Sequence, residues 1–207
     1  MEINAERVVE LVKSVRPLFM DHERASRITV KGAADFVTQV DFLVQERMRS
    51  GLFDMYPQVQ FMGEEKDNRD IDFSGAVWIL DPVDGTTNLI HDFRCSALSL
   101  ALCDRGQMEL GIIYQPYEDE LFLAQRGKGA FLNGNPIHVS SVKDLGQSLI
   151  SIGTSPYNHD LADRNFEDIK RVFLKCSDIR RTGSAAVDLA YVACGRLDAY
   201  FERCLNP

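Results

Sequence analysis

The stretch Trp78-Ile79-Leu80-Asp81-Pro82-Val83-Asp84-Gly85-Thr86-Thr87-Asn88 joins an apolar run to two carboxylates, a proline and a glycine. The apolar run predicts a buried strand that delivers both aspartates at its C-terminal end. Proline has no N–H to donate to a sheet ladder, so the strand is expected to end at Pro82. Gly85 lets the backbone turn, and Thr86 can then cap the first turn of a following helix.

Several oxygen ligands gather in this stretch: the carboxylates of Asp81 and Asp84, the Val83 carbonyl and the Thr86 hydroxyl. Mg²⁺ prefers carboxylate and carbonyl oxygens, and helix N-termini favour phosphate. The stretch could therefore hold a hard cation and a phosphate together. The alternative is a strand end with two solvated aspartates and a turn glycine, which is the commoner meaning of an isolated Asp-x-x-Asp-Gly.

Two upstream motifs count against that alternative. They are Gly63-Glu64-Glu65 and, earlier, Lys31-Gly32-x-x-Asp35-x-Val37-Thr38-x-x-Asp41. With Asp-Pro-Val-Asp-Gly-Thr-Thr-Asn, these motifs resemble, in order and spacing, the signature of the inositol monophosphatase family of Mg²⁺-dependent, lithium-sensitive phosphatases. Three ordered motifs are far more specific than one.

The resemblance implies a metal site made by Glu64, Asp81, the Val83 carbonyl and Asp84, with Mg²⁺ as the cofactor. Glu64, Asp81 and Val83 would hold one ion, and Asp81 and Asp84 would contribute to a second. The residue pattern is compatible with this, because Glu64 and Asp81 both follow β-like runs. Neighbouring strands that end together would bring these two carboxylates around one ion.

The resemblance also implies catalytic roles. Glu64 and Thr86 would position the attacking water, and Asp41 would hydrogen-bond Thr86. By themselves Thr38 and Asp41 predict only a capping box that opens a helix. Lys31 matches a family lysine near the metal and is expected to support the site through water. We expect no side-chain nucleophile, because no cysteine or serine sits beside a base in the central motif.

A second group of residues is expected on the substrate side. Gly183 and Ser184 open a predicted helix, whose N-terminus can bind hydroxyl or phosphate oxygens, although an ordinary cap explains the pattern equally well. In the family, the residues matching 183–185 line the substrate pocket, and the glutamate matching Glu202 hydrogen-bonds a sugar hydroxyl. The resemblance therefore gives this substrate-binding set: Asp84, Gly85, Thr86, Gly183, Ser184, Ala185 and Glu202.

Hydrophobic patterning predicts an α/β chain. Residues 4–24 read as an amphipathic helix that Pro17 should interrupt, and residues 96–124 read as an antiparallel meander. A later helix is expected to place Leu189, Val192 and Ala193 inside. The resemblance implies a layered α-β-α-β-α sandwich of the inositol monophosphatase type.

The family's pattern continues past the residue matching Pro207 with Trp-Asp, whose aspartate ligates a second metal. We therefore expect one inositol monophosphatase-like domain over residues 1–207 that lacks the family's C-terminal part. The strand at 197–201 would then expose a backbone edge and apolar side chains, which favours pairing with another chain. We expect a homodimer.

Composition narrows the expected partners. The chain has 23 basic and 31 acidic residues, a net charge of −8, which argues against general binding to nucleic acid or to a membrane surface. The five cysteines have no Cys-x-x-Cys spacing. Because signal-peptide and long apolar patterns are also lacking, we expect a cytoplasmic protein.

The expected function is metal-dependent hydrolysis of a small phosphate monoester, with myo-inositol monophosphate as the leading substrate. Thr86-Thr87-Asn88 after Asp-Gly favours the inositol type within the family. Two alternatives stay open. One is another sugar or nucleotide phosphatase of the same superfamily, and the other is a catalytically impaired binding or scaffolding protein.

Overall fold

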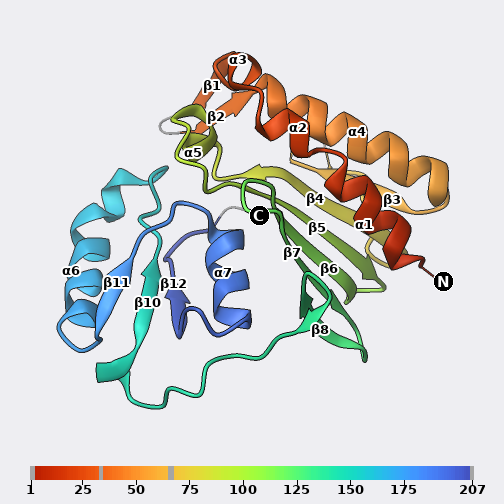
Figure 1. Cartoon of the computed structure of the whole chain (residues 1–207). Coiled ribbons are helices and arrows are strands. Elements are labelled where there is room, and N and C mark those ends of the chain that lie inside the picture. The colour runs from red at the N-terminus through yellow and green to blue at the C-terminus, as the bar shows by residue number, and fades with distance from the viewer. Residues whose placement is uncertain (1–2, 33–34, 65–67, 206–207) are drawn as a thin grey trace.

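Helices and sheets alternate in layers in the computed structural model, which describes residues 3–32, 35–64 and 68–205 (Figure 1). Helices α1, α2 and α4 cover one face of a seven-stranded sheet. Helix α7 lies between that sheet and a three-stranded sheet, and α6 lies on the far side of the smaller sheet. The predicted α/β fold with a layered α-β-α-β-α sandwich is confirmed.

The N-terminal helical segment is divided, as Pro17 predicts. Pro17 lies in the first turn of a new helix, where a missing N–H costs nothing. Val8 and Val12 are fully buried on the inner face of the first helix. The elements of this layer are α1 (Ala5–Lys13), α2 (Arg16–Phe19), α3 (His22–Ala25), the hairpin of β1 (Ile28–Gly32) and β2 (Asp35–Thr38), and α4 (Gln39–Met55).

The seven-stranded sheet contains the predicted meander. Its first two strands run parallel, with Gly63 beside Leu80, and the remaining pairs are antiparallel. Trp78, Leu100 and Ile112 form its buried face against the N-terminal helices. In spatial order the strands are β3 (Gln60–Gly63), β4 (Ala76–Asp84), β5 (Ala97–Asp104), β6 (Gln107–Gln115), β7 (Glu120–Gln125), β8 (Gly129–Leu132) and β9 (Asn135–Pro136).

The expected end of the strand at Pro82 is wrong, because β4 continues to Asp84. Asp81 pairs with Ser99 and Asp84 with Ala97, so one extra residue bulges out of the β4 side. A bulge removes the need for a ladder hydrogen bond from proline. It also re-aims the side chains at the strand end, which is where both aspartates lie.

The smaller sheet is parallel and has its own core of Ile150, Ile152 and Ile169. The expected inner face of α7 is wrong: Leu189 is 51% exposed, Ala193 is also exposed and Val192 is only half-buried. The buried residues of this helix are Val187, Asp188 and Ala190. The elements of this half are β10 (Leu149–Ile152), α6 (Ala162–Phe173), β11 (Asp178–Arg180), α7 (Ala185–Ala193), β12 (Ala199–Phe201) and 3₁₀ turns at Leu145–Gln147 and His159–Leu161.

Two further features concern the whole chain. Among the described residues, no helix is both long and apolar enough to cross a membrane. All five cysteines carry free thiols.

Candidate active site

The C-terminal end of β4 carries two half-buried aspartates. The Val83 N–H donates to Asp81 Oδ1 at 3.0 Å and fixes that side chain. Burial raises the pKa of Asp81 well above its usual range, and the charges of Asp84, Glu64 and Asp41 raise it further. In the described part of the chain no arginine or lysine forms an ion pair with Asp81 or Asp84. Such a cluster attracts a cation.

Glu64 comes to this cluster from the neighbouring strand. Because β3 and β4 are parallel and Gly63 pairs with Leu80, Glu64 follows β3 at the level of Asp81. Glu64 is exposed and close enough to raise the pKa of Asp81. Glu65, the third residue of its motif, lies outside the described residues.

Asp84 is held by the N-terminus of α7. Its Oδ2 atom accepts the Ser184 hydroxyl at 2.5 Å and the Ala186 N–H at 2.7 Å. Ser184 is also the N-cap of α7, since its Oγ accepts from the Val187 N–H at 3.3 Å. Burial raises the pKa of Asp84, the two donors oppose that shift, and the charge of Glu202 adds to it. The large sheet and the helix between the sheets therefore meet at one carboxylate.

Thr86 lies in the first turn of α5 (Thr86–Ile90) and is not its N-cap, which corrects the sequence prediction. Gly85 takes the cap position. The Thr86 hydroxyl lies 3.0 Å from the Val83 carbonyl and 3.3 Å from Asp41 Oδ1, so it donates back toward β4 and α4.

Asp41 is buried, with 2% of its surface exposed. Its Oδ2 accepts from the Thr38 N–H at 2.8 Å and from the Thr38 hydroxyl at 2.6 Å. The predicted capping box at the start of α4 is thus confirmed. It turns the other carboxylate oxygen toward Thr86.

A turn around Gly85 brings α5 and the segment before α7 together. Gly85 has a φ of 87°, and a Cβ there would lie 3.1 Å from the Cys95 carbonyl and 3.2 Å from the Gly183 carbonyl. Asn88, which sequence reasoning missed, donates to the Cys95 carbonyl at 2.6 Å and the Thr182 carbonyl at 2.8 Å. Two glycines are therefore needed here, since Gly183 in turn packs against the Asn88 side chain.

Glu202 lies just after β12 and is held on both oxygens. Oε1 accepts from the Ser155 N–H at 2.7 Å, and Oε2 accepts from the Tyr200 hydroxyl at 2.5 Å. Gly153 makes room for the carboxylate, which any larger residue would displace. Of the expected substrate residues, Glu202 and Asp84 are close enough for their charges to interact. Sequence reasoning missed Ser155 and Tyr200, which give no motif signal.

Two other residues were expected at the site, Ala185 in the substrate pocket and Lys31 near the metal. Ala185 is the first residue of α7 and is half-buried beside the Asp84 contact. The side chain of Lys31 lies outside the described part of the structure, so its supporting role stays a prediction.

The donor set fits a hard divalent cation. Among the described residues, no group of three or more His, Cys, Asp or Glu side chains converges closely enough to hold a metal by itself. Mg²⁺ does not need such a cage, because it is usually bound by one or two carboxylates together with water and phosphate oxygens. Asp81, Asp84 and the Val83 carbonyl supply that kind of set.

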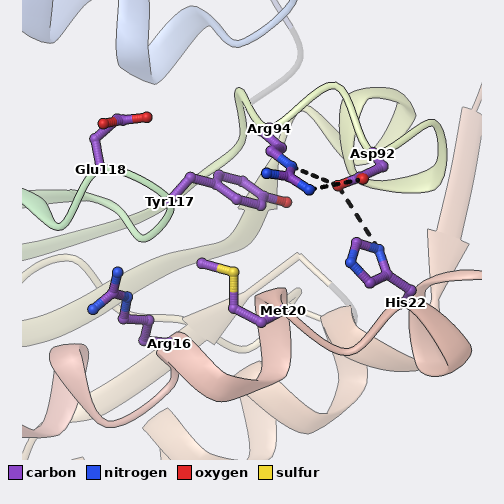
Figure 2. A pocket seen from close by; sticks show the side chains of 7 residues that line it. All are labelled: Arg16, Met20, His22, Asp92, Arg94, Tyr117 and Glu118. Carbon is purple, nitrogen blue, oxygen red and sulfur yellow. Dashed lines mark hydrogen bonds and ion pairs between the residues drawn. The ribbon is translucent and has the colours of Figure 1, made fainter.

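A surface cavity of about 220 Å³ lies apart from this site (Figure 2). Several of its polar side chains contact one another. Arg94 donates from Nε to Asp92 Oδ1 at 3.2 Å and from Nη2 to Asp92 Oδ2 at 3.3 Å, and His22 Nδ1 lies 3.7 Å from Asp92 Oδ1. Arg16 Nε donates to the Pro116 carbonyl at 2.8 Å. The cavity contains none of the predicted site residues; it is lined by Arg16, Met20, His22, Asp92, Arg94, Tyr117 and Glu118.

Comparison with known proteins identifies the family. The model of the inositol monophosphatase family matches residues 2–207. The chain belongs to the inositol monophosphatase family. It is 36% identical to an inositol monophosphatase of Dictyostelium discoideum over 98% of this chain and 76% of that protein.

Other members of the family are similar to a comparable degree. The Escherichia coli K12 protein called Nus factor SuhB is 38% identical over 86% of this chain and 66% of its own length. The crystal structure of extragenic suppressor protein suhB from Bartonella henselae superposes with a TM-score of 0.90 at 33% identity, covering 97% of this chain and 78% of that one. The chain thus spans about two-thirds to three-quarters of these relatives.

Proposed function

We propose that this chain hydrolyses small phosphate monoesters in a Mg²⁺-dependent reaction, with myo-inositol monophosphate as the first substrate to test. The observation that carries the proposal is the pair of half-buried carboxylates, Asp81 and Asp84, at one strand end without a protein cation among the described residues. Leaving such charges uncompensated is costly unless a ligand neutralises them.

Asp81, Asp84, the Val83 carbonyl and Glu64 would hold the metal ions. Bound Mg²⁺ would neutralise phosphate charge and make water a better nucleophile at neutral pH. The protein's part is to fix its own oxygens: Val83 orients Asp81, and α7 orients Asp84. Both orienting donors are backbone N–H groups of the protein itself.

Thr86 and Asp41 would orient the attacking water. The Thr86 hydroxyl has one proton, for which the Val83 carbonyl and Asp41 are both acceptors. Its lone pairs therefore remain to accept a hydrogen bond from water. Glu64, exposed at the end of β3, is the proposed partner that takes up the proton of that water.

The substrate class follows from the residues opposite the carboxylates. Glu202 and the start of α7 would offer polar groups to a hydroxylated leaving group, and residues 183–185 would line the rest of the substrate pocket. A relative described as inositol monophosphate-bound SaIMPase-II is 27% identical with a TM-score of 0.79, which supports testing that ester first. Another relative is described as an IMPase/NADP phosphatase in complex with NADP and Ca²⁺, so nucleotide esters belong in the same panel.

The family resemblance leads us to propose three further properties: inhibition by Li⁺, a homodimer in solution and a cytoplasmic location. A binding or scaffolding role without hydrolysis is the alternative function. The name Nus factor, carried by a relative at 38% identity, is the observation that favours it.

Phosphate release from a panel of sugar, nucleotide and aryl monoesters, with and without Mg²⁺, tests the proposal. We expect Mg²⁺-dependent release that the Asp81→Asn variant lacks while it keeps its circular dichroism spectrum. Equal release by the variant and the parent would exclude Asp81 from the reaction. A parent that binds its esters but releases no phosphate would favour the binding role.

A further inference from the structure

Arg181 is a cation beside the candidate site that the proposed reaction does not use. It is exposed and lies in the connection from β11 to α7. Among the described residues its guanidinium forms no ion pair, and its one hydrogen bond runs from Nη2 to the Thr154 hydroxyl at 3.3 Å. A guanidinium carries several N–H donors in a planar fork. Most donors of Arg181 are therefore available to a ligand.

On one side, Arg181 contacts the segment that holds Glu202. Its partner Thr154 is followed by Ser155, whose N–H donates to Glu202 Oε1 at 2.7 Å. Thr154 is itself fixed, because its carbonyl accepts from Asn165 Nδ2 at 3.1 Å. The hydrogen bond from Arg181 therefore ends on the segment next to the Glu202 carboxylate.

On the other side, Arg181 packs against the segment that holds Asp84. A Cβ at Gly183 would lie only 2.7 Å from Nη1 of Arg181, so the guanidinium is in contact with this glycine. The next residue, Ser184, donates its hydroxyl to Asp84 Oδ2 at 2.5 Å. Arg181 thus touches both segments from which the two substrate-side carboxylates are held.

The charges around Arg181 show what it could bind. Asp84 and Glu202 would repel a second anionic group on the alcohol part of a substrate, and Arg181 is a cation next to both segments that hold them. Burial raises the pKa of Asp188 to about 6, and the charge of Arg181 opposes that rise. No ion pair joins these two residues in the described part of the chain. The guanidinium therefore keeps its donors for a group that arrives from solvent.

We propose that Arg181 forms a subsite for a second anionic group, a carboxylate or a phosphate, on the alcohol part of the substrate. The inference rests on the proposed function, because it assumes that the scissile phosphate binds at Asp81 and Asp84. A guanidinium fork matches two oxygens of either anionic group. Arg181 should therefore favour acidic phosphate esters over neutral esters of the same shape.

Two matched pairs of esters test the subsite. Glycerol 2-phosphate and 2-phosphoglycerate differ only in a hydroxymethyl group that is replaced by a carboxylate. Propane-1,3-diol monophosphate and bisphosphate make the same comparison for a second phosphate. The measured quantity is the ratio of kcat/KM for the acidic ester to kcat/KM for the neutral one. Comparing this ratio between the parent and a variant cancels differences in the intrinsic reactivity of the esters.

The expected result is a loss of selectivity in Arg181→Gln. Hydrogen bonds to charged groups contribute on the order of 10-fold, and less where water screens them, so the ratio should fall about 5- to 10-fold for the pair whose acidic group Arg181 binds. Arg181→Lys keeps the charge but loses the planar fork, so its ratio should lie between those of the parent and Arg181→Gln. Because the guanidinium is exposed, the selectivity of the parent should also shrink as the salt concentration rises.

Arg180→Gln is the matched control. Arg180 is exposed and adjacent in sequence, but its Nη1 atom bonds Asp178 and, at 2.8 Å, the Ile179 carbonyl. This variant removes the same charge without touching Thr154 or Gly183, so its ratio should stay close to that of the parent. Equal falls in the two glutamine variants would overturn the subsite in favour of a general electrostatic effect. An unchanged ratio for both ester pairs in Arg181→Gln would also overturn it, even if every ester were hydrolysed more slowly.

Failure of the subsite can be told apart from failure of the proposed function. If the parent hydrolyses the esters and Arg181→Gln keeps the parent's ratios, only the subsite is wrong. If the parent releases no phosphate from any ester, the proposed function fails. Calorimetric titration with the same esters in MgCl₂ then decides the subsite through the ratio of affinities, and a parent that binds none of them overturns the subsite as well.

Discussion

At the scale of single residues, the candidate site brings Asp81 and Asp84 together, and among the described residues no arginine or lysine forms an ion pair with either of them. Burial and neighbouring carboxylates raise the pKa of Asp81 and of Asp84, and the two donors on α7 only partly oppose this for Asp84. Evolution commonly accepts such local instability where a ligand will bind. Removing one charge should therefore stabilise the metal-free chain.

The first prediction concerns Asp81→Asn. In the absence of metal, its free energy of unfolding should exceed that of the parent by on the order of 1 kcal/mol, a rise of about 2–4 °C in Tm. In millimolar Mg²⁺ the order should reverse, because only the parent gains stability from binding. Differential scanning calorimetry at both conditions measures this. A variant that is less stable than the parent without metal would mean that Asp81 already has a compensating partner.

The second prediction uses the pKa of Asp188, which burial raises to about 6 from 3.8. Between these two values the folded chain keeps a proton that the unfolded chain releases, so this group makes stability fall as pH rises and then level off above about pH 6. Relative to the parent, Asp188→Asn should gain stability from pH 4 to pH 7, by up to about 3 kcal/mol. Urea unfolding at the two pH values tests the sign, which would be opposite if Asp188 were stabilised as an anion.

At the scale of elements, the start of α7 could be predicted from the sequence, but the face that it buries could not. The N-cap at Ser184 could be predicted, because serine at a helix start has a local chemical reason. The buried face could not, because apolar periodicity favours Leu189 inside and gives no reason to bury Asp188. Asp188 is buried although its Oδ1 atom has no hydrogen-bond partner among the described residues, so no local pattern in the sequence predicts its position.

The C-terminal end of β4 was also predicted only in part. The two aspartates at its end were found from their spacing, but Pro82 predicted that the strand would stop. The structure instead carries the proline in a bulge, which depends on how β5 pairs beside it. How two strands pair is a tertiary property, so it cannot be predicted from the local β-propensity of one segment.

The third prediction separates the two roles of the Ser184 hydroxyl, which caps α7 and bonds Asp84. Ser184→Ala should lose about 1 kcal/mol of stability as a missing N-cap and should also weaken Mg²⁺ binding about 10-fold. Asn4→Ala is the matched control, because Asn4 caps α1 through the Arg7 N–H at 3.1 Å, far from the site. It should show the stability loss alone. A Mg²⁺ affinity that falls equally in both variants would point to a general effect of destabilisation.

At the scale of the whole molecule, the site is assembled where the two sheets face each other across α7 (Figure 1). The larger sheet contributes Asp81 and Asp84, and the end of β12 contributes Glu202. The ordered motifs were enough to predict this layered fold and its family. The way in which Ser155 and Tyr200 hold Glu202 could not be predicted, because neither residue belongs to a recognisable pattern.

The fourth prediction concerns Glu202→Gln. Both oxygens of the Glu202 carboxylate accept hydrogen bonds, one from the Ser155 N–H and one from the Tyr200 hydroxyl. In the glutamine variant the side-chain NH₂ group would face one of these donors, which would disturb this side of the proposed substrate pocket. Turnover of sugar phosphates should fall about 10-fold, the cost of roughly 1.4 kcal/mol in hydrogen bonding. An aryl phosphate without those hydroxyls should lose less. Comparing kcat/KM for the two esters measures the difference, and equal losses would place Glu202 outside the substrate pocket.

Asp81 and Asp84 are proposed to form a metal-dependent phosphatase site. The most direct test is a Mg²⁺ titration of phosphate release from myo-inositol monophosphate by the 207-residue chain. We expect saturable release that is absent in EDTA, is restored by added Mg²⁺ and is abolished in Asp81→Asn. Release that persists in EDTA, or that Asp81→Asn retains in full, would contradict it.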